Sequence, residues 1–289
     1  MNKNIQLLII DPQNDFCDIP EAELPALNHT AANSTMPIVP IAHLALPVTG
    51  ADADMKRLAK LIARIGTKLS EIHVTLDSHH TIDIAHPGWW RNATGDAPAP
   101  FTAITAADVA NGAWKARDPA QQAASSAYVQ ALEKNGRYLL VVWPEHCLIG
   151  SWGHNIHGHV KTALDQWARQ QMKRIDFVIK GTHPGTEHYS AIQAEVPDAA
   201  DPSTQLNRPL IAALSRAGEV IVAGEALSHC VASTVRDLAN NIGETNIRKL
   251  VLLTDCASPV AGFEKQGSDF VKELCARGMR TATSATLSI

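Results

Sequence analysis

Residues 219–240 read EVIVAGEALSHCVASTVRDLAN, and this stretch decides the fold class. Its first part, EVIVAGEA, is a short apolar run of strand length. Continuous apolar character over that length indicates a strand buried on both faces of a sheet. The part from Cys230 onward has the looser spacing of an amphipathic helix. A buried strand followed directly by a helix is typical of an α/β fold with a parallel sheet.

The same alternation recurs along the chain. Five further apolar runs are IQLLIID (5–11), EIHVTLD (71–77), RYLLVVWP (137–144), DFVIKG (176–181) and KLVLLTD (249–255). Helical patterns lie between them, and the clearest is residues 51–69, where apolar side chains recur at spacings of three and four. Looser patterns of the same kind cover 161–171, 207–218, 230–243 and 264–278. We therefore expect a mostly parallel sheet covered by helices on both sides.

Two stretches interrupt this rhythm, at about 18–50 and 87–120. Segments this long between elements of a compact domain are commonly lids or interface elements. A length of 289 residues, without a linker or an internal repeat, favours a single domain (1–289) that carries these two insertions. Neither GxGxxG nor a P-loop follows any strand, so we expect no nucleotide cofactor.

Charge and hydropathy limit the partners and the location. The formal net charge is −4, the pI is near 6.3, and no long block of Lys or Arg occurs, which argues against nucleic acid and anionic membranes. No run of about 18 apolar residues is present. The start, MNKNIQLLIIDPQNDF, has the pattern of a strand rather than of a signal peptide. We expect a cytoplasmic protein with a small-molecule partner.

Three polar residues at strand ends suit covalent catalysis. Asp11, Lys180 and Cys230 each follow a different apolar run, and the carboxyl ends of parallel strands share one edge of a sheet. A thiolate is a nucleophile, a carboxylate can take and return its proton, and an ammonium stabilises the anionic forms. Taken alone, each residue has a plainer interpretation: a cap, a solvated edge charge and a packed thiol. Because all three residues share a position at strand ends, we favour the catalytic interpretation.

A second group suits a divalent metal ion. Asp77 and His79 follow the run EIHVTL, and His146 follows LLVVWPE. One carboxylate and two or three imidazoles with an open position are typical ligands of catalytic Zn, Fe or Mn. His86, nine residues after Asp77, is a possible further ligand. We expect one bound divalent ion, and Zn is the first candidate.

The sequence resembles the cysteine hydrolases that include nicotinamidase and isochorismatase. The matching segments, in the family's order, are LLIIDPQNDFCD, VTLDSH, WPEHC, VIKGTHPGTEHYSA and GEALSHCVASTVRDLA. The resemblance implies a three-layer α/β/α sandwich with a six-stranded, mostly parallel sheet, and Asp11, Lys180 and Cys230 as the catalytic triad. It also implies a cis peptide between Glu225 and Ala226, with the N–H groups of Ala226 and Cys230 forming an oxyanion hole.

The metal motif places the resemblance on the nicotinamidase side, because isochorismatase-like members lack that site. The residues that resemble the lining of a nicotinamide pocket are Phe16, Trp143, Tyr189 and His229, and we place Glu225 in the same pocket. Members of the family often assemble, so we expect a homo-oligomer. Trp89, Trp90 and Trp114 in the second insertion are predicted to bury at a subunit contact or to line the pocket.

The resemblance implies an amidohydrolase that cleaves a small carboxamide, nicotinamide or a related amide, through a cysteine thioester. Two features depart from nicotinamidases: Ser228 stands where an Asp is common, and Glu225 interrupts a more apolar segment. Three alternatives stay open. One is a hydrolase of an acyclic amide of the ureido or maleamate kind, another is a vinyl-ether hydrolase such as isochorismatase, and the last is a non-catalytic binding module on this fold.

Overall fold

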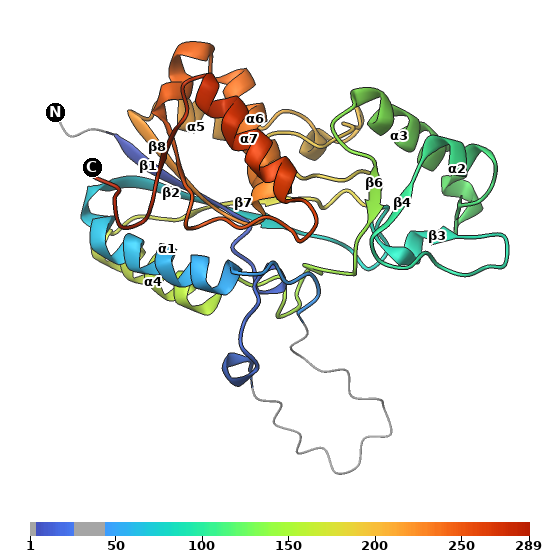
Figure 1. The fold of residues 1–289 in the computed structure, drawn as a ribbon, viewed down its shortest axis with the longest axis horizontal. Helices are drawn as coiled ribbons and strands as arrows, with labels where there is room; N and C mark the ends of the chain where they lie inside the picture. The colour runs from blue at the N-terminus through green and yellow to red at the C-terminus, as the bar shows by residue number, and fades with distance from the viewer. Residues whose placement is uncertain (1–3, 26–43) are drawn as a thin grey trace, which may run out of the picture.

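The central feature of the computed structural model, which describes residues 4–25 and 44–289, is a six-stranded sheet (Figure 1). Every neighbouring pair of strands in it is parallel. In sheet order the strands are β10 (Arg280–Ala282), β9 (Leu250–Leu253), β8 (Glu219–Gly224), β1 (Ile5–Ile10), β2 (Leu69–Asp77) and β7 (Asp176–Lys180). All residues of β1 and β8 are buried, as their continuous apolar character predicts.

Helices cover both faces of the sheet (Figure 1). On one face lie α1 (Ala51–Ile65) and α4 (Gly158–Gln171), and on the other lie α5 (Arg208–Ser215), α6 (Ala232–Asn241) and α7 (Glu264–Ala276). The predicted apolar face of α1 is buried at Met55, Leu58, Leu61, Ile62 and Ile65. The predicted α/β/α sandwich is therefore confirmed.

Short helical turns connect these elements. They are Asn14–Phe16, Glu21–Glu23, Gly66–Lys68, Pro87–Trp89, Pro119–Gln121, Leu227–Val231, Pro202–Thr204 and Glu244–Lys249. Residues 26–43, which belong to the predicted 18–50 insertion, lie outside the described residues. Among the described helices, none is long and apolar enough to cross a membrane.

Residues 84–142 form a small lobe at the end of the molecule beyond β7 (Figure 1). Its elements are β3 (Trp90–Arg91), β4 (Thr102–Ile104), α2 (Ala106–Ala110), β5 (Lys115–Ala116), α3 (Gln122–Asn135) and β6 (Leu140–Val142). β3 pairs with β5 and β4 with β6, both antiparallel. The lobe has a hydrophobic cluster of its own, separate from the main core.

The lobe corrects the prediction made for residues 137–144. The apolar run 137–144 contributes β6, which pairs with β4 instead of joining the main sheet. The sixth strand of that sheet is β10, whose residues are exposed or half-buried because it lies at the sheet edge, so its sequence lacks the apolar signal. Trp89 and Trp90 are buried in the core of the lobe, and Trp114 packs against it. Trp89 also lines a cavity. A subunit contact through these residues stays a prediction.

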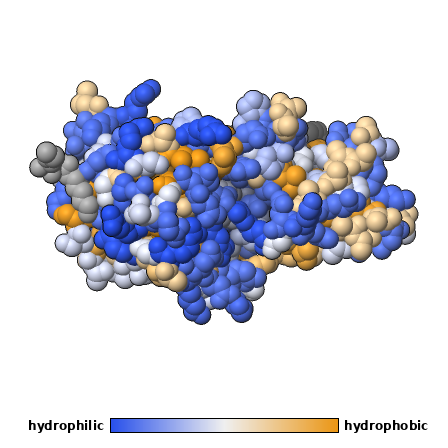
Figure 2. Space-filling view, turned by 90° about the horizontal axis from the view of Figure 1, so that it is seen from above, coloured by the Kyte–Doolittle hydropathy of each residue, from blue (hydrophilic) through white to orange (hydrophobic). Residues whose placement is uncertain are grey.

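The face drawn in Figure 2 is mostly hydrophilic, and hydrophobic residues show on it in separate groups, some of them at the lobe end. The predicted homo-oligomer is not tested by this single chain and stays a prediction.

The order of the strands in the sheet determines where the candidate site lies. β8, β1, β2 and β7 are consecutive neighbours, so their carboxyl ends lie side by side. Asp11 follows β1, Asp77 ends β2 and Lys180 ends β7, while the chain leaving β8 leads to Cys230. Parallel sheets bind ligands at this edge.

Candidate active site and metal centre

Asp11, Lys180 and Cys230 meet at the carboxyl-terminal ends of the strands, as their positions in the sequence predict. Lys180 Nζ lies 2.9 Å from Asp11 Oδ2 and 3.7 Å from Cys230 Sγ. The same ammonium donates to the His188 carbonyl at 2.9 Å. Donor atoms of Asp11, Asp77 and Cys230 all lie within 4.8 Å of one another. All of these side chains are buried, so their charges act through protein and not through water.

Thr75 holds the Asp11 carboxylate in place. Asp11 has a left-handed backbone with φ of 44°, which an Asp tolerates better than most residues. Thr75 Oγ1 on β2 accepts the Asp11 N–H at 3.0 Å and donates to Asp11 Oδ1 at 2.5 Å. Because Oδ1 of the carboxylate is bound to Thr75, Oδ2 is the oxygen that pairs with Lys180. Sequence reasoning missed Thr75, although a hydroxyl inside a buried apolar strand was a signal for it.

Burial and charge set the resting proton positions. Burial raises the pKa of the Cys230 thiol well above its usual range, and the Lys180 charge opposes that shift. Burial also raises the pKa of Asp11, again against the Lys180 charge. A proton moving from Sγ to Asp11 leaves the total charge of the group unchanged, and Lys180 is close to both anions. The group can thus generate a thiolate without creating net charge in a buried place.

The chain between β8 and Cys230 presents two backbone donors. The Glu225–Ala226 peptide is cis, as predicted, and Leu227–Val231 is a single π-helical turn that runs into α6. The N–H groups of Leu227, His229 and Val231 bond to backbone carbonyls. Those of Ala226 and Cys230 make no such bond outside the turn itself to any described residue. Backbone N–H groups beside a thiol, here those of Ala226 and of Cys230 itself, suit a developing oxyanion.

The predicted metal ligands Asp77, His79 and His146 also meet. Asp77 Oδ2 lies 3.2 Å from His79 Nε2 and 3.6 Å from His146 Nε2. His86 joins them, since its Nε2 lies 3.3 Å from His146 Nδ1 and its donor atom is within 4.8 Å of those of the other two histidines. Burial lowers the pKa of His86 to about 2, which keeps its ring neutral and able to bind a metal.

The hydrogen bonds around this cluster fit a cation. His146 Nδ1 lies 2.8 Å from the Pro144 carbonyl and His79 Nδ1 lies 3.0 Å from Asp83 Oδ2, so each Nδ1 acts as the donor. Nε2 of His79 and Nε2 of His146 then both face Asp77 Oδ2. Although burial opposes it, the charges of Asp77 and Asp83 raise the pKa of His79 well above its usual range, so a cation bound here would take the place of the ring proton. Asp83, four residues after His79, was not predicted, although its spacing placed it within reach.

Three of the predicted pocket residues form an aromatic group beside Cys230. His229 packs against Trp143 and Tyr189, with ring centroids 5.2 and 5.3 Å away. Two further rings, not predicted, complete the group: Tyr138 at 5.4 Å and Phe263 at 4.7 Å from His229. Their roles depend on tertiary packing that no local pattern reveals. We call these five residues the aromatic group.

The other two predicted pocket residues lie elsewhere. Phe16 packs edge-on against His146 at 5.4 Å, on the side of the metal ligands. Glu225 is fully buried, and its Oε2 accepts the Ser258 N–H at 3.0 Å. Burial, together with Asp54 of α1, raises its pKa well above the usual range. The structure therefore places the Glu225 carboxyl against α1, not in the aromatic group.

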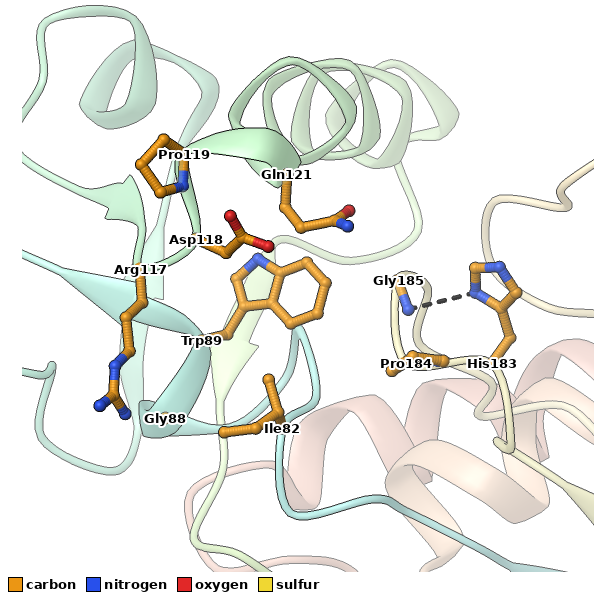
Figure 3. A pocket seen from close by; sticks show the side chains of 10 residues that line it. All are labelled: Ile82, Gly88, Trp89, Arg117, Asp118, Pro119, Gln121, His183, Pro184 and Gly185. Atoms are coloured by element: carbon orange, nitrogen blue, oxygen red, sulfur yellow. Dashed lines mark hydrogen bonds between the residues drawn. The ribbon is translucent and has the colours of Figure 1, made fainter.

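A cavity of about 820 Å³ opens between the lobe and the turn at 183–185 (Figure 3). Trp89 faces it from the lobe, and His183 and Pro184 border it from the opposite side. Its lining includes none of the Asp11, Lys180, Cys230 or metal-ligand residues. This cavity is therefore separate from the candidate active site and from the candidate metal centre.

Comparisons with known proteins agree on the fold. No family model and no curated protein matches the sequence. Among solved structures, a nicotinamidase/pyrazinamidase of Acinetobacter baumanii is 19% identical with a TM-score of 0.59, over 98% of this chain and 97% of that one. Yeast nicotinamidase Pnc1p bound to nicotinaldehyde is 17% identical with a TM-score of 0.61, over 96% and 99%. Pyrococcus horikoshii pyrazinamidase in complex with zinc is 16% identical with a TM-score of 0.50, over 97% and 99%.

These likenesses define the fold class: the chain has the α/β/α fold of the nicotinamidase and pyrazinamidase structures that it matches. Within that class it is similar in structure to the nicotinamidases along almost the whole length of both chains.

Proposed function

We propose that the protein is an amidohydrolase that cleaves a small carboxamide through a thioester on Cys230. The observation that carries this proposal is the meeting of Cys230 Sγ, the Asp11 carboxylate and Lys180 Nζ beside the turn that carries the N–H groups of Ala226 and Cys230. A nucleophile, a proton carrier and an oxyanion hole are the parts that acyl transfer requires. The fold shared with nicotinamidases supports the same reaction class.

In the first half-reaction Asp11 takes the proton of Cys230, and the thiolate attacks the amide carbonyl carbon. The N–H groups of Ala226 and Cys230 stabilise the oxyanion, and each such donor is typically worth about 10²–10³ in rate. Collapse of the tetrahedral species breaks the C–N bond, and Asp11 gives its proton to the departing ammonia. An acyl thioester on Cys230 remains.

In the second half-reaction Asp11 takes a proton from a water molecule that attacks the thioester carbon. The same two N–H groups stabilise the second oxyanion. The C–S bond then breaks, the carboxylic acid leaves, and the sulfur receives the proton held by Asp11. Lys180 stays charged throughout, because burial alone would lower its pKa but the Asp11 and Asp77 charges raise it well above the usual range.

Asp77, His79 and His146, with His86, would hold one divalent ion, and the zinc complex of the Pyrococcus pyrazinamidase supports zinc as the first candidate. In this role the ion would orient a ring atom of the substrate while Cys230 and Asp11 do the bond-breaking.

The substrate class we propose is a planar aromatic carboxamide such as nicotinamide. The five rings of the aromatic group favour a flat ring over an acyclic ureido or maleamate-like amide, because stacked and edge-on contacts stabilise aromatic ligands. We also propose that residues 1–289 act as one domain, with the lobe as an elaboration of it.

Ammonia release from a panel of amides tests this function. The panel contains nicotinamide, other aromatic carboxamides and acyclic amides, with the Cys230→Ala protein as control. Ammonia from aromatic carboxamides with wild-type protein alone supports the proposal. Ammonia from acyclic amides alone would replace the substrate class, and turnover that persists in Cys230→Ala would refute the mechanism.

A further inference from the structure

Ser258 bridges the two residues that flank Ala226. The Ser258 N–H donates to Glu225 Oε2 at 3.0 Å, and the Ser258 carbonyl accepts the N–H of Leu227 at 2.9 Å. Ala226 lies between these two residues and carries one of the N–H groups proposed to stabilise the oxyanion. The segment that follows β9 therefore holds the chain on both sides of Ala226.

Two further bonds join the same segments. The Gly224 N–H donates to the Cys256 carbonyl at 2.9 Å, and the Val260 N–H donates to Ser228 Oγ at 3.1 Å. The acceptors in these two bonds are a carbonyl and a hydroxyl, which carry no charge. The bond to Glu225 is different, because its acceptor is a group that can ionise.

A second buried carboxyl group meets Glu225. Glu225 is fully buried, Asp54 of α1 is 2% exposed, and the two carboxyl groups are in hydrogen-bonding contact. Asp54 also accepts the Ser258 hydroxyl through Oδ2 at 2.6 Å and pairs with Arg57 through Oδ1. Two buried carboxyl groups in contact repel each other strongly if both are charged, so one of them holds a proton.

The partners of the two carboxyl groups place this proton on Glu225. Asp54 has a guanidinium and a hydroxyl as donors, whereas Glu225 Oε2 has one backbone N–H and Oε1 has no donor among the described residues. Burial and the charge of Asp54 raise the pKa of Glu225 well above its usual range, and the charge of Asp18 acts in the same direction. As a neutral acid, Glu225 donates to Asp54 and accepts the Ser258 N–H.

We propose that Glu225, held as a neutral acid by Asp54, is a positioning residue for the oxyanion hole. Its fully buried side chain acts through Ser258, which fixes the backbone on both sides of Ala226. The inference rests on the proposed function, because an oxyanion forms only if Cys230 attacks a carbonyl carbon. Since the oxyanion exists in the transition state and not in the bound substrate, a displaced Ala226 N–H lowers kcat and leaves KM nearly unchanged.

Glu225→Gln and Glu225→Leu separate the hydrogen bonds of this side chain from the space that it fills. The Gln amide can accept the Ser258 N–H and donate to Asp54, so it reproduces both bonds of the neutral acid. Leu makes neither bond. Glu219→Leu is the matched control, because Glu219 is a buried carboxyl at the opposite end of β8 that pairs with Arg280.

Steady-state kinetics on an aromatic carboxamide test the positioning role. We expect Glu225→Gln to keep a kcat close to that of the wild-type protein, and Glu225→Leu to lower kcat by about tenfold or more at nearly unchanged KM. Glu219→Leu should lose stability in a urea titration and keep its kcat. An unchanged kcat in Glu225→Leu, or an equal loss in Glu225→Gln and Glu225→Leu, would contradict the proposal.

Infrared difference spectroscopy tests the proton on Glu225 without any turnover and needs only the Glu225→Gln variant. At neutral pH the difference between wild-type protein and Glu225→Gln should contain the carbonyl stretch of a protonated carboxylic acid. Carboxylate bands in its place would overturn the neutral acid. Failure of the proposed function has a separate signature: the wild-type protein would release no ammonia from any amide, while the infrared spectra would still report the Glu225 proton.

Discussion

The Lys180 ammonium lies 2.9 Å from Asp77 Oδ1, so the cation beside the proposed nucleophile also touches the candidate metal centre. The same Nζ lies 2.9 Å from Asp11 Oδ2. Although burial alone would raise the pKa of Asp77, the charges of Lys180 and His79 hold it well below its usual range. The buried Lys180 ammonium thus pairs with two carboxylates: Asp11, the proposed proton carrier, and Asp77, a proposed metal ligand.

Lys180→Met should separate these tasks. Without the ammonium, Asp11 keeps its proton and no cation stabilises the thiolate, so we expect kcat to fall by about a hundredfold or more. Metal affinity should be kept or increased, because the removed charge repels a divalent ion. Amidase assays and competition with a chelator measure both quantities, and Lys265→Met, at an exposed position, is the control. Loss of metal in parallel with activity would assign Lys180 to the metal centre instead.

Asp83→Asn should weaken the metal site. The Asp83 carboxylate accepts from His79 Nδ1 through one oxygen and from the Ala85 N–H through the other. Asn has a single acceptor oxygen, so one of these bonds is lost and His79 is held less firmly. We expect metal affinity to fall about 10–100-fold. Equilibrium dialysis with Zn²⁺ measures this, with the exposed Asp165→Asn as control. Equal affinities for both variants would refute the proposed role of Asp83.

Gly224→Ala should disturb the chain that leads to Cys230. Gly224 has φ of 121°, and an added Cβ would lie 1.9 Å from the Ile10 carbonyl oxygen of the neighbouring strand. We expect the free energy of unfolding to fall by about 3 kcal/mol or more. Gly136→Ala is the matched control, since Gly136 also has a positive φ, of 70°, but no atom within 4 Å, and about 1 kcal/mol is expected there. Urea titration measures both, and equal losses would contradict the clash.

Glu195→Gln should change how stability depends on pH. Burial raises the pKa of Glu195 to about 8, against the charge of Arg137 and with the charges of Asp237 and Glu187. An unfolded Glu releases its proton near pH 4, so between that pH and about 8 the folded state holds one more proton. Glu195 therefore makes the protein less stable as pH rises through this window, by at most about 1.4 kcal/mol per pH unit.

Denaturant titrations at several pH values from 5 to 9 test this sign. The wild-type protein should lose stability with rising pH more steeply than Glu195→Gln, and the two slopes should converge above pH 8. A variant whose slope equals that of the wild-type protein across the window would contradict a raised pKa at Glu195.

Much of the fold was predictable because buried parallel strands have a strong local signal. β1 and β8 are apolar except for Gln6 and Glu219, and both were located within a residue or two. β10 gave no such signal, since an edge strand with exposed side chains does not need apolar residues. The run containing β6 was apolar for a different reason: it packs in the lobe, and periodicity does not say which sheet a strand joins.

The candidate site was predictable where function coincides with a strand end. Asp11, Lys180 and Cys230 come together because parallel neighbours end at one edge. The supporting residues were not predictable from the sequence in the same way. Tyr138 and Phe263 reach His229 from distant segments, and only the packed structure brings their rings together.

The most direct test of the central claim is mass spectrometry of protein quenched during turnover of an aromatic carboxamide. We expect an acyl group bound to the peptide that contains Cys230, lost on treatment with hydroxylamine, and no adduct in Cys230→Ala. An adduct on Cys17, Cys147, Cys256 or Cys275 in its place, or full ammonia release by Cys230→Ala, would contradict Cys230 as the nucleophile.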